Sequence, residues 1–214
     1  MIAILPIRSG SKGIPHKNIK LFNEKPLIWW TLNTLENSNV DKIIVASDDQ
    51  HYLKIVEDFN FTKVNLFKRT QECSTDTATS ESVLLEVISV LNLNDDILFV
   101  QATSPLTTSK DFNKGIELYK EYDSVLSGVK QQRFIWGKEG NSLNYDYKNR
   151  PRRQDWEGYF VENGAFYINS SNNILKHKNR LSGNIGLCEM DEFHYYEIDS
   201  MQDWAILENL QKYI

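Results

Sequence analysis

The chain has little cysteine, little histidine and no long apolar run. Cys73 and Cys188 form no CxxC motif, and the four histidines show no metal-ligand spacing, so a zinc site is not expected. The longest apolar runs, such as 97–100, are strand-sized and fall far short of the roughly 18 residues of a membrane helix. No basic leader precedes the apolar N-terminal segment, so we expect no secretory signal. We expect reduced thiols in a cytoplasmic protein, with a disulfide between the two cysteines as the alternative.

An excess of positive charge is also missing. The 24 Lys and Arg residues are outnumbered by 29 Asp and Glu residues, which gives a net charge of −5. The protein as a whole is therefore not expected to bind nucleic acid or an anionic membrane, and any anionic ligand needs a local basic cluster. Hydrophobic residues make up 41% and charged residues 25% of the 214 positions, which is the composition of a folded globular chain. This length suits one domain over residues 1–214.

Short apolar segments alternate with segments of helical periodicity as far as residue 129. The sequence predicts strands at 2–7, 42–46, 63–67, 96–100 and 124–129, and helices at 27–35, 50–59, 79–92 and 111–122. This alternation is typical of a three-layer α/β fold with a doubly wound, mostly parallel sheet. Ligands of such sheets bind at the carboxyl ends of the strands, so the polar loops after the first, second and fourth strands form the candidate site.

The pattern changes after residue 130. Residues 131–158 are aromatic and charged without clear periodicity, and so long an irregular segment predicts a functional loop or an interaction arm. Strands are expected again around 160–168, 184–190 and 195–198. A C-terminal helix is expected over 203–210, with Asp203 as its N-cap.

A basic, glycine-containing loop at 8–18 follows the first strand. It carries Arg8, Lys12 and Lys17 together with two glycines and two serines. Glycine and serine let backbone N–H groups converge on an anion, and three cations suit a triphosphate. The GxxxxGK[ST] and GxGxxG spacings are absent, so the loop is neither a P-loop nor a dinucleotide-binding loop. The alternative is a solvated surface turn.

Five segments, in matching order, resemble a known family. The run IAILPIRSGSKGIPHKNIKLFNEKPLI at 2–28 is similar to the opening motif of the acylneuraminate cytidylyltransferases, the CMP-sialic acid synthetases. Further resemblances are KIIVASDD at 42–49, RTQECSTDTATS at 69–80, FVQATSPL at 99–106 and PRRQDWEGYFVENGAFYI at 151–168. The acidic residues from Glu197 to Asp203 resemble the C-terminal motif of the same family. The resemblance implies a Rossmann-like nucleotidyltransferase domain.

For the nucleotide, the resemblance assigns charge stabilisation on the transferring and leaving phosphates to Arg8, Lys12 and Lys17, which is electrostatic catalysis. Three further positions match the triphosphate loop of the family, namely Ser11, Gly13 and Asn18. Three others match its cytosine site, namely Arg69, Ala78 and Ser80. A small side chain at 78 would leave room for the base. Without the resemblance, the Ser/Thr-rich residues 74–80 would be interpreted as a helix cap.

For the sugar, the resemblance assigns contacts to Gln101, Thr103, Ser104, Arg153, Asn163 and Tyr167. Arg153 is the expected partner of the sugar carboxylate, because arginine binds carboxylates in a bidentate manner, and Arg152 is the alternative. Without the resemblance, residues 101–105 also fit a strand-to-helix turn. The two arginines also fit an ion pair at the surface or at a dimer interface, and Tyr167 also fits a tyrosine of the hydrophobic core. Thr107 departs from the basic residue that many family members carry after this motif.

For the metal, Glu197 and Asp199 lie on one face of an extended segment, and carboxylates two residues apart suit Mg²⁺, which nucleoside triphosphates require. The usual family pattern is Asp-x-Asp, so Glu197 is a departure and Asp199 is the expected main ligand. The resemblance further implies a homodimer in which residues 131–168 form a dimerisation and sugar-binding arm.

The expected reaction is transfer of CMP from CTP to the anomeric hydroxyl of an acidic nine-carbon sugar, N-acetylneuraminate or a close relative, with release of pyrophosphate. Two alternatives stay open. One is the same chemistry on legionaminate, pseudaminate or a 3-deoxy-octulosonate. The other is a nucleotide-binding module without turnover.

Overall fold

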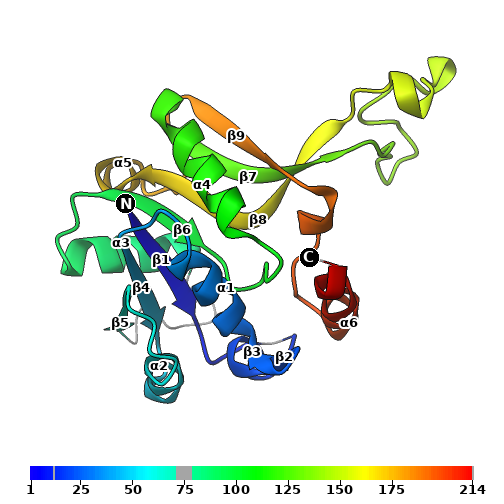
Figure 1. The fold of residues 1–214 in the computed structure, drawn as a ribbon. Helices are drawn as coiled ribbons and strands as arrows, with labels where there is room; N and C mark the ends of the chain where they lie inside the picture. Colours follow the sequence, from blue (N-terminus) through cyan, green and yellow to red (C-terminus); the bar gives the residue numbers. More distant parts are fainter. Residues whose placement is uncertain (12, 71–78, 214) are drawn as a thin grey trace.

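A seven-stranded sheet organises the chain, whose structure is a computed structural model that describes residues 1–11, 13–70 and 79–213 (Figure 1). The strand order is β5-β4-β1-β6-β8-β7-β9. These strands are β1 (Ile2–Ile7), β4 (Lys42–Ser47), β5 (Val64–Lys68), β6 (Asp96–Val100), β7 (Ser124–Gln131), β8 (Tyr159–Ser170) and β9 (Ile185–Met190). Neighbouring strands are parallel except at β8, which runs antiparallel to β6 and to β7. The prediction of a mostly parallel sheet is confirmed.

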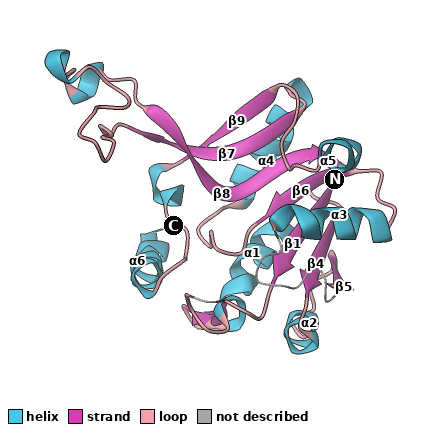
Figure 2. Cartoon of the chain, turned by 180° about the vertical axis from the view of Figure 1, so that it is seen from behind, coloured by secondary structure: helices cyan, strands magenta, loops and turns pink. Residues whose placement is uncertain are grey.

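Helices cover both faces of this sheet, which gives the three predicted layers (Figures 1 and 2). The first face packs against α1 (Leu27–Glu36), α2 (Gln50–Glu57) and α4 (Ser109–Leu118), and the second against α3 (Ser80–Val90) and α5 (Ser171–His177). Alternate side chains of β1 divide between the two faces, because side chains of a strand point to opposite sides in turn. Ala3, Leu5 and Ile7 lie in the first apolar cluster, and Ile2 and Ile4 lie in the second.

A third, smaller apolar cluster joins the polar loops at one edge of the sheet. It consists of Ile14, Phe22, Leu27, Leu106, Ile198, Trp204 and Leu207. Phe22 belongs to a short hairpin, β2 (Leu21–Phe22) with β3 (Lys25–Pro26), and the two last residues belong to α6 (Met201–Leu210). The loop at 8–18, the turn after β6 and the segment before α6 therefore share one hydrophobic anchor.

Two local predictions are wrong. Residues 195–198 are not a strand, because Glu192–Tyr195 forms a 3-10 helix and the following residues are irregular. Asp203 is not the N-cap of the last helix, because α6 begins two residues earlier and Ser200 is its cap. Asp203 instead occupies the third helical position and accepts a hydrogen bond from the Ser200 hydroxyl at 2.7 Å, which completes a capping box. The other predicted strands and helices are present.

Residues 132–158 leave the sheet between β7 and β8 and project away from it (Figures 1 and 2). We call residues 132–158 the arm; the remainder of the predicted arm at 131–168, namely Gln131 and residues 159–168, belongs to strands β7 and β8 of the sheet. Its own aromatic residues pack together, with Phe134 4.2 Å from Tyr145 and 5.8 Å from Trp156 between ring centroids, and with the Arg150 guanidinium 4.5 Å above the Phe134 ring. Other large apolar side chains of the arm, among them Trp136 and Leu143, are exposed.

Two further predictions concern cysteine and membranes. Cys188 is a buried free thiol, and burial raises the pKa of this thiol to about 11. Cys73 lies outside the described residues. Within the described ranges, no helix has the length and apolar character needed to cross a membrane.

Candidate active site

A cavity of about 380 Å³ opens at the carboxyl ends of β1 and β6. It receives residues from the loop after β1, from the start of α3, from the turn after β6 and from the segment before α6. Eight predicted site residues that the structure describes line this cavity, and one metal-ligand candidate joins them: Arg8, Ser11, Lys17, Asn18, Arg69, Ser80, Gln101, Thr103 and Asp199. Residues up to 191 positions apart in sequence thus meet where a doubly wound sheet binds its ligands.

The loop at 8–18 is held in place by polar contacts at both ends. The Ser9 backbone N–H and hydroxyl each donate to the Asp48 carboxylate at 3.0 Å, which ties the loop to the end of β4. The Asn18 side-chain amide donates to the Arg8 carbonyl at 3.0 Å and closes the loop on itself. Because Asn18 is buried, this hydrogen bond is shielded from water and stabilises the conformation of the loop. Lys12 lies outside the described residues.

Lys17 links the basic loop to the acidic segment. Its Nζ donates to the Ile198 carbonyl at 2.6 Å and to the Asp199 carboxylate at 3.2 Å. Ile198 is fully buried in the third apolar cluster, and its N–H donates to the Thr103 carbonyl at 2.8 Å. Because this residue anchors the segment, its neighbours Glu197 and Asp199 are set beside the cavity.

Gly13 allows a close approach between the same two segments. A Cβ at this position would lie 2.5 Å from the Asp199 carbonyl oxygen, which is closer than side chains tolerate. A glycine is therefore required at this position for backbone packing, independently of its predicted role in the triphosphate loop.

The carboxyl group of Glu197 has a shifted pKa. Burial raises the pKa of this carboxyl above its usual value, and the neighbouring Asp199 charge raises it further, while Lys17 acts in the opposite direction. A second positive charge beside these carboxylates would relieve both effects.

The proposed cytosine side of the cavity contains Arg69, Thr79, Ser80 and Val83. Arg69 is buried and directly follows β5, and its backbone N–H donates to the Ser47 carbonyl at 2.8 Å, which extends the pairing of β5 with β4 by one residue. Thr79 caps α3 by accepting from the Ser82 N–H. The alternative interpretation of residues 74–80 as a helix cap therefore holds for Thr79, and this residue also lines the cavity. Ala78 lies outside the described residues.

Arg180 supports the wall of the cavity and has no counterpart among the predicted residues. Its guanidinium lies 5.1 Å from the Phe99 ring and 4.7 Å from the Tyr167 ring, and its Nε donates to Glu81 at 2.6 Å. Phe99 lines the cavity and Glu81 lies in the first turn of α3. Arg180 thus fastens α3 to the sheet behind the site. No local motif marks this arginine, because its partners come from three distant segments.

Four predicted sugar residues do not line this cavity. Ser104 and Tyr167 are buried behind it; the Tyr167 ring stacks on Phe99, and its hydroxyl donates to Glu162. Asn163 is buried, and its amide bonds to Ser127 and His194. Arg153 lines a second cavity of about 620 Å³ at the base of the arm, with Arg133, Arg150 and Arg152. Among the described residues of one chain, the two cavities share no lining residue.

The residues present fit a magnesium ion bound together with a nucleotide. In the part of the chain that the structure describes, no three His, Cys, Asp or Glu side chains group closely enough to hold a metal. Magnesium in phosphate sites is usually held by one or two carboxylates and by the phosphates themselves, which is what Glu197 and Asp199 beside a basic loop provide. Burial and the Asp199 charge raise the pKa of Glu197, and this is the observation that favours a cation beside the two carboxylates.

A basic loop and a carboxylate pair, at the carboxyl ends of a mostly parallel sheet, are typical of a site for a phosphorylated ligand and a divalent cation. The sequence matches the family of cytidylyltransferases over residues 2–213, and the chain belongs to this family. It is similar to N-acylneuraminate cytidylyltransferase B of Danio rerio, at 31% identity over 223 residues, which cover 96% of this chain and 50% of the relative. The chain thus spans about half the length of such curated relatives.

Two other proteins match over most of their own length. Post-translational flagellin modification protein B of Campylobacter coli is 26% identical over 96% of this chain and 92% of its own. A solved structure of CMP:2-keto-3-deoxy-manno-octonic acid synthetase complexed with CTP has a TM-score of 0.74 at 16% identity, over 99% of this chain and 98% of that one. At this identity the second likeness shows the fold alone.

Proposed function

We propose that the chain transfers CMP from CTP to the anomeric hydroxyl of an acidic nine-carbon sugar of the N-acylneuraminate class and releases pyrophosphate. The observation that supports this proposal most directly is that one cavity contains Arg8 and Lys17 from the loop at 8–18 together with Asp199 from the segment before α6. The N-acylneuraminate cytidylyltransferases among its relatives support the choice of sugar.

In this reaction the sugar hydroxyl oxygen attacks the α-phosphorus, the bond to the β-phosphate oxygen breaks, and the hydroxyl proton passes to water. Arg8 and Lys17 stabilise the charge that grows on the leaving pyrophosphate. Ser11 and Asn18 hold the loop that presents these cations, and Arg69 and Ser80 face the base. Gln101 and Thr103 contact the sugar at the end of β6. Magnesium held by Glu197 and Asp199 would neutralise phosphate charge when bound.

The active unit in this proposal is a homodimer in the cytoplasm. The arm carries exposed apolar residues and a cavity lined by four arginines, and neither belongs to the nucleotide cavity of its own chain. Docking on a second copy would bury the apolar residues and bring Arg153, or Arg152, to the carboxylate of that copy's sugar. The buried free thiol of Cys188 agrees with a reducing compartment.

A second candidate keeps the chemistry and changes the sugar to legionaminate, pseudaminate or a 3-deoxy-octulosonate. The Campylobacter coli relative, named for flagellin modification and matched over 92% of its length, favours testing these sugars.

Pyrophosphate release from CTP with Mg²⁺ and a panel of these sugars tests the proposal. Release with N-acetylneuraminate above the other sugars supports it, and preference for another sugar selects the second candidate. Preference for UTP or GTP over CTP contradicts the cytosine assignment. CTP binding without release for any sugar indicates a binding module without turnover.

A further inference from the structure

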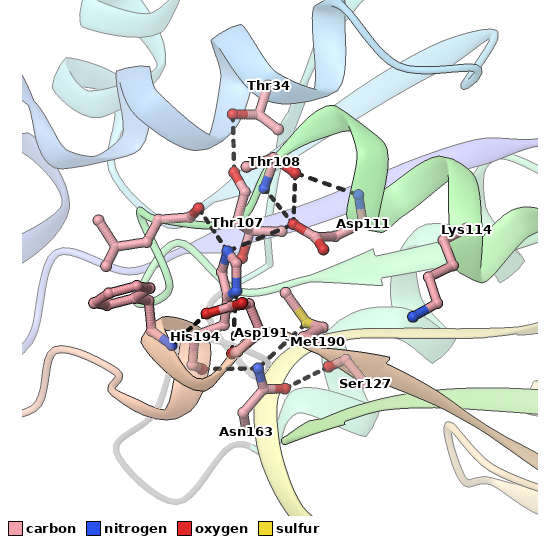
Figure 3. Close-up of polar contacts among 12 residues, drawn as sticks. Thr34, Thr107, Thr108, Asp111, Lys114, Ser127, Asn163, Met190, Asp191 and His194 are labelled. Atoms are coloured by element: carbon pink, nitrogen blue, oxygen red, sulfur yellow. Dashed lines mark hydrogen bonds and ion pairs between the residues drawn. The ribbon is translucent and has the colours of Figure 1, made fainter. Parts of the chain in front are cut away.

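A buried histidine stands three residues before the acidic pair. His194 lies in the 3-10 helix Glu192–Tyr195 and is 8% exposed. Figure 3 shows its ring among polar groups from four segments of the chain. Its Nε2 lies 3.0 Å from the Leu106 carbonyl and 3.5 Å from the Asp111 carboxylate, and its Nδ1 lies 3.3 Å from the Asp191 carbonyl.

The hydrogen on Nε2 can be assigned from its partners. Both ring nitrogens face oxygens that only accept hydrogen bonds, and we assign the hydrogen to Nε2 because its 3.0 Å contact with the Leu106 carbonyl is shorter than the 3.3 Å contact of Nδ1 with the Asp191 carbonyl. Leu106 ends the FVQATSPL segment that supplies Gln101 and Thr103 to the cavity. Asp111 is itself fixed by the capping box of α4, where it accepts from the Thr108 hydroxyl at 2.6 Å (Figure 3). The ring therefore joins the acidic segment to the turn after β6 and to the start of α4.

Asn163 completes this connection from the sheet. Its Nδ2 donates to the His194 carbonyl at 2.9 Å and contacts the Met190 sulfur at 3.3 Å, and its Oδ1 accepts from the Ser127 hydroxyl at 2.7 Å (Figure 3). With both ends of the amide bonded inside the protein, the side chain has little capacity left for a sugar. Its bonds instead hold the histidine backbone on β8.

We propose that His194 and Asn163 are positioning residues that set the Glu197–Asp199 segment against the nucleotide cavity. The inference rests on the proposed function in that these carboxylates bind the magnesium of the CTP complex. Other contacts hold the segment after Glu197: the Ile198 N–H donates to Thr103, the Ile198 side chain packs in the third apolar cluster, and Lys17 donates to the Ile198 carbonyl and the Asp199 carboxylate. The contacts of His194 hold the chain on the other side of Glu197.

Two substitutions of His194 distinguish the effect of losing its N–H donor from the effect of losing the imidazole ring. His194→Leu removes the donor to Leu106, and His194→Gln keeps an N–H that can reach it. Asn163→Leu removes the tie to β8. Asn169→Leu is the matched control, because Asn169 is a buried amide on the same strand that bonds the Arg180 carbonyl at 3.2 Å and the Ser182 hydroxyl at 3.1 Å. His194→Asn serves as a milder replacement if the leucine variant does not fold.

The first measurement needs neither metal nor substrate. Amide hydrogen exchange in a peptide that covers residues 195–200 of the metal-free protein reports the freedom of the segment. We expect exchange about tenfold faster in His194→Leu and Asn163→Leu, and within about twofold of wild type in His194→Gln and Asn169→Leu. Unchanged exchange in both leucine variants at 163 and 194 would overturn the proposal, because the segment would then be held without them.

The second measurement is the Mg²⁺ concentration for half-maximal pyrophosphate release. Loss of a residue that orients metal ligands should raise it about tenfold, with the sugar KM within about twofold. A rise confined to the sugar KM in Asn163→Leu would mean that Asn163 contacts the sugar, and would contradict the positioning role. If wild-type protein releases no pyrophosphate with any sugar, the proposed function fails, while the exchange measurement still decides the role of His194.

Discussion

Charge at single residues determines what this cavity can stabilise. Arg8 and Lys17 are the described cations of the loop that line it, and Lys17 is already engaged by the Asp199 carboxylate and the Ile198 carbonyl. Part of the Lys17 charge is therefore offset before any phosphate binds. Arg8 also lines the cavity, and it is the cation of this loop at which we test electrostatic catalysis.

Arg8→Ala should lower kcat for pyrophosphate release about 100-fold, because its charge matters most when the leaving group gains negative charge. The sugar KM should change less than about threefold, since this interaction strengthens in the transition state. Steady-state kinetics with saturating CTP checks both values. Lys20→Ala is the control, because Lys20 lies on the Trp204 ring, 5.7 Å from its centroid, and does not line the cavity. Equal losses in the two variants would contradict the prediction.

Glu197 should make the metal-free protein less stable as the pH rises. Because its pKa is raised by burial and by Asp199, the folded state holds this proton more tightly than the unfolded chain does. Stability from this group is complete below the ordinary glutamate pKa of 4.5 and is lost as the pH rises through the higher folded value. Glu197→Gln cannot ionise, so it should be more stable than wild type at pH 7 and show no such gain at pH 4.

Thermal unfolding between pH 4 and pH 8 measures this difference. Glu117→Gln, a change at a surface carboxylate of α4, should follow the wild-type profile. The same Glu197→Gln variant should need more Mg²⁺ for activity, which would show a residue kept for binding at a cost in stability. A stability difference that does not change with pH would contradict the argument.

Among elements, the contact between the basic loop and the acidic segment decides the geometry of the site. Gly13→Ala should force the two backbones apart, because its Cβ would meet the Asp199 carbonyl oxygen at 2.5 Å. A shift of about 1 Å at this place should reduce kcat/KM for CTP by up to about 100-fold. Kinetics and thermal unfolding together check this result. Gly137→Ala is the control, since its Cβ would meet at 2.5 Å only the Asn141 side chain in the arm, which can rotate away.

The regular elements could be predicted because each follows a period that the sequence displays. Strand β1 alternates between two apolar faces, and Asp49 is the N-cap of α2, where its carboxylate accepts from the His51 N–H at 2.7 Å. The segment at 195–198 could not, since its apolar Ile198 is buried by α6 and by the loop rather than by a neighbouring strand. The cap of α6 was misplaced for a related reason, because Ser200 and Asp203 are both good capping residues and only the backbone distinguishes them.

The candidate site could be predicted where a motif lies on one strand end, as at Arg8 and Gln101. It could not be predicted where distant segments meet. Arg180 acts through Glu81 and two rings, and His194 acts through Leu106 and Asn163. No spacing in the sequence reveals such partners, because they are created by the strand order β1-β6-β8-β7.

At the scale of the whole molecule, the nucleotide cavity and the arm are separable parts. The two sheet faces and the third apolar cluster include no residue of the arm. The arm's aromatic residues pack on one another, and Gln131 of β7 pairs directly with Tyr159 of β8 where the arm begins and ends. An Asn-Gly turn that replaces residues 132–158 should therefore close the two antiparallel strands into an ordinary hairpin.

This truncated protein should fold, bind CTP with a Kd within about threefold of the full chain, and run as a monomer, because only surface contacts of the fold are removed. It should lose turnover with every sugar, since Arg152 and Arg153 are gone. Light scattering after size exclusion, calorimetric CTP titration and pyrophosphate release measure the three properties. Arg153→Ala in the full chain is the matched variant, and it should stay dimeric and mainly raise the sugar KM. A truncated protein that remains dimeric would show that the arm is not the interface, and one that keeps its turnover would show that the sugar carboxylate is bound elsewhere.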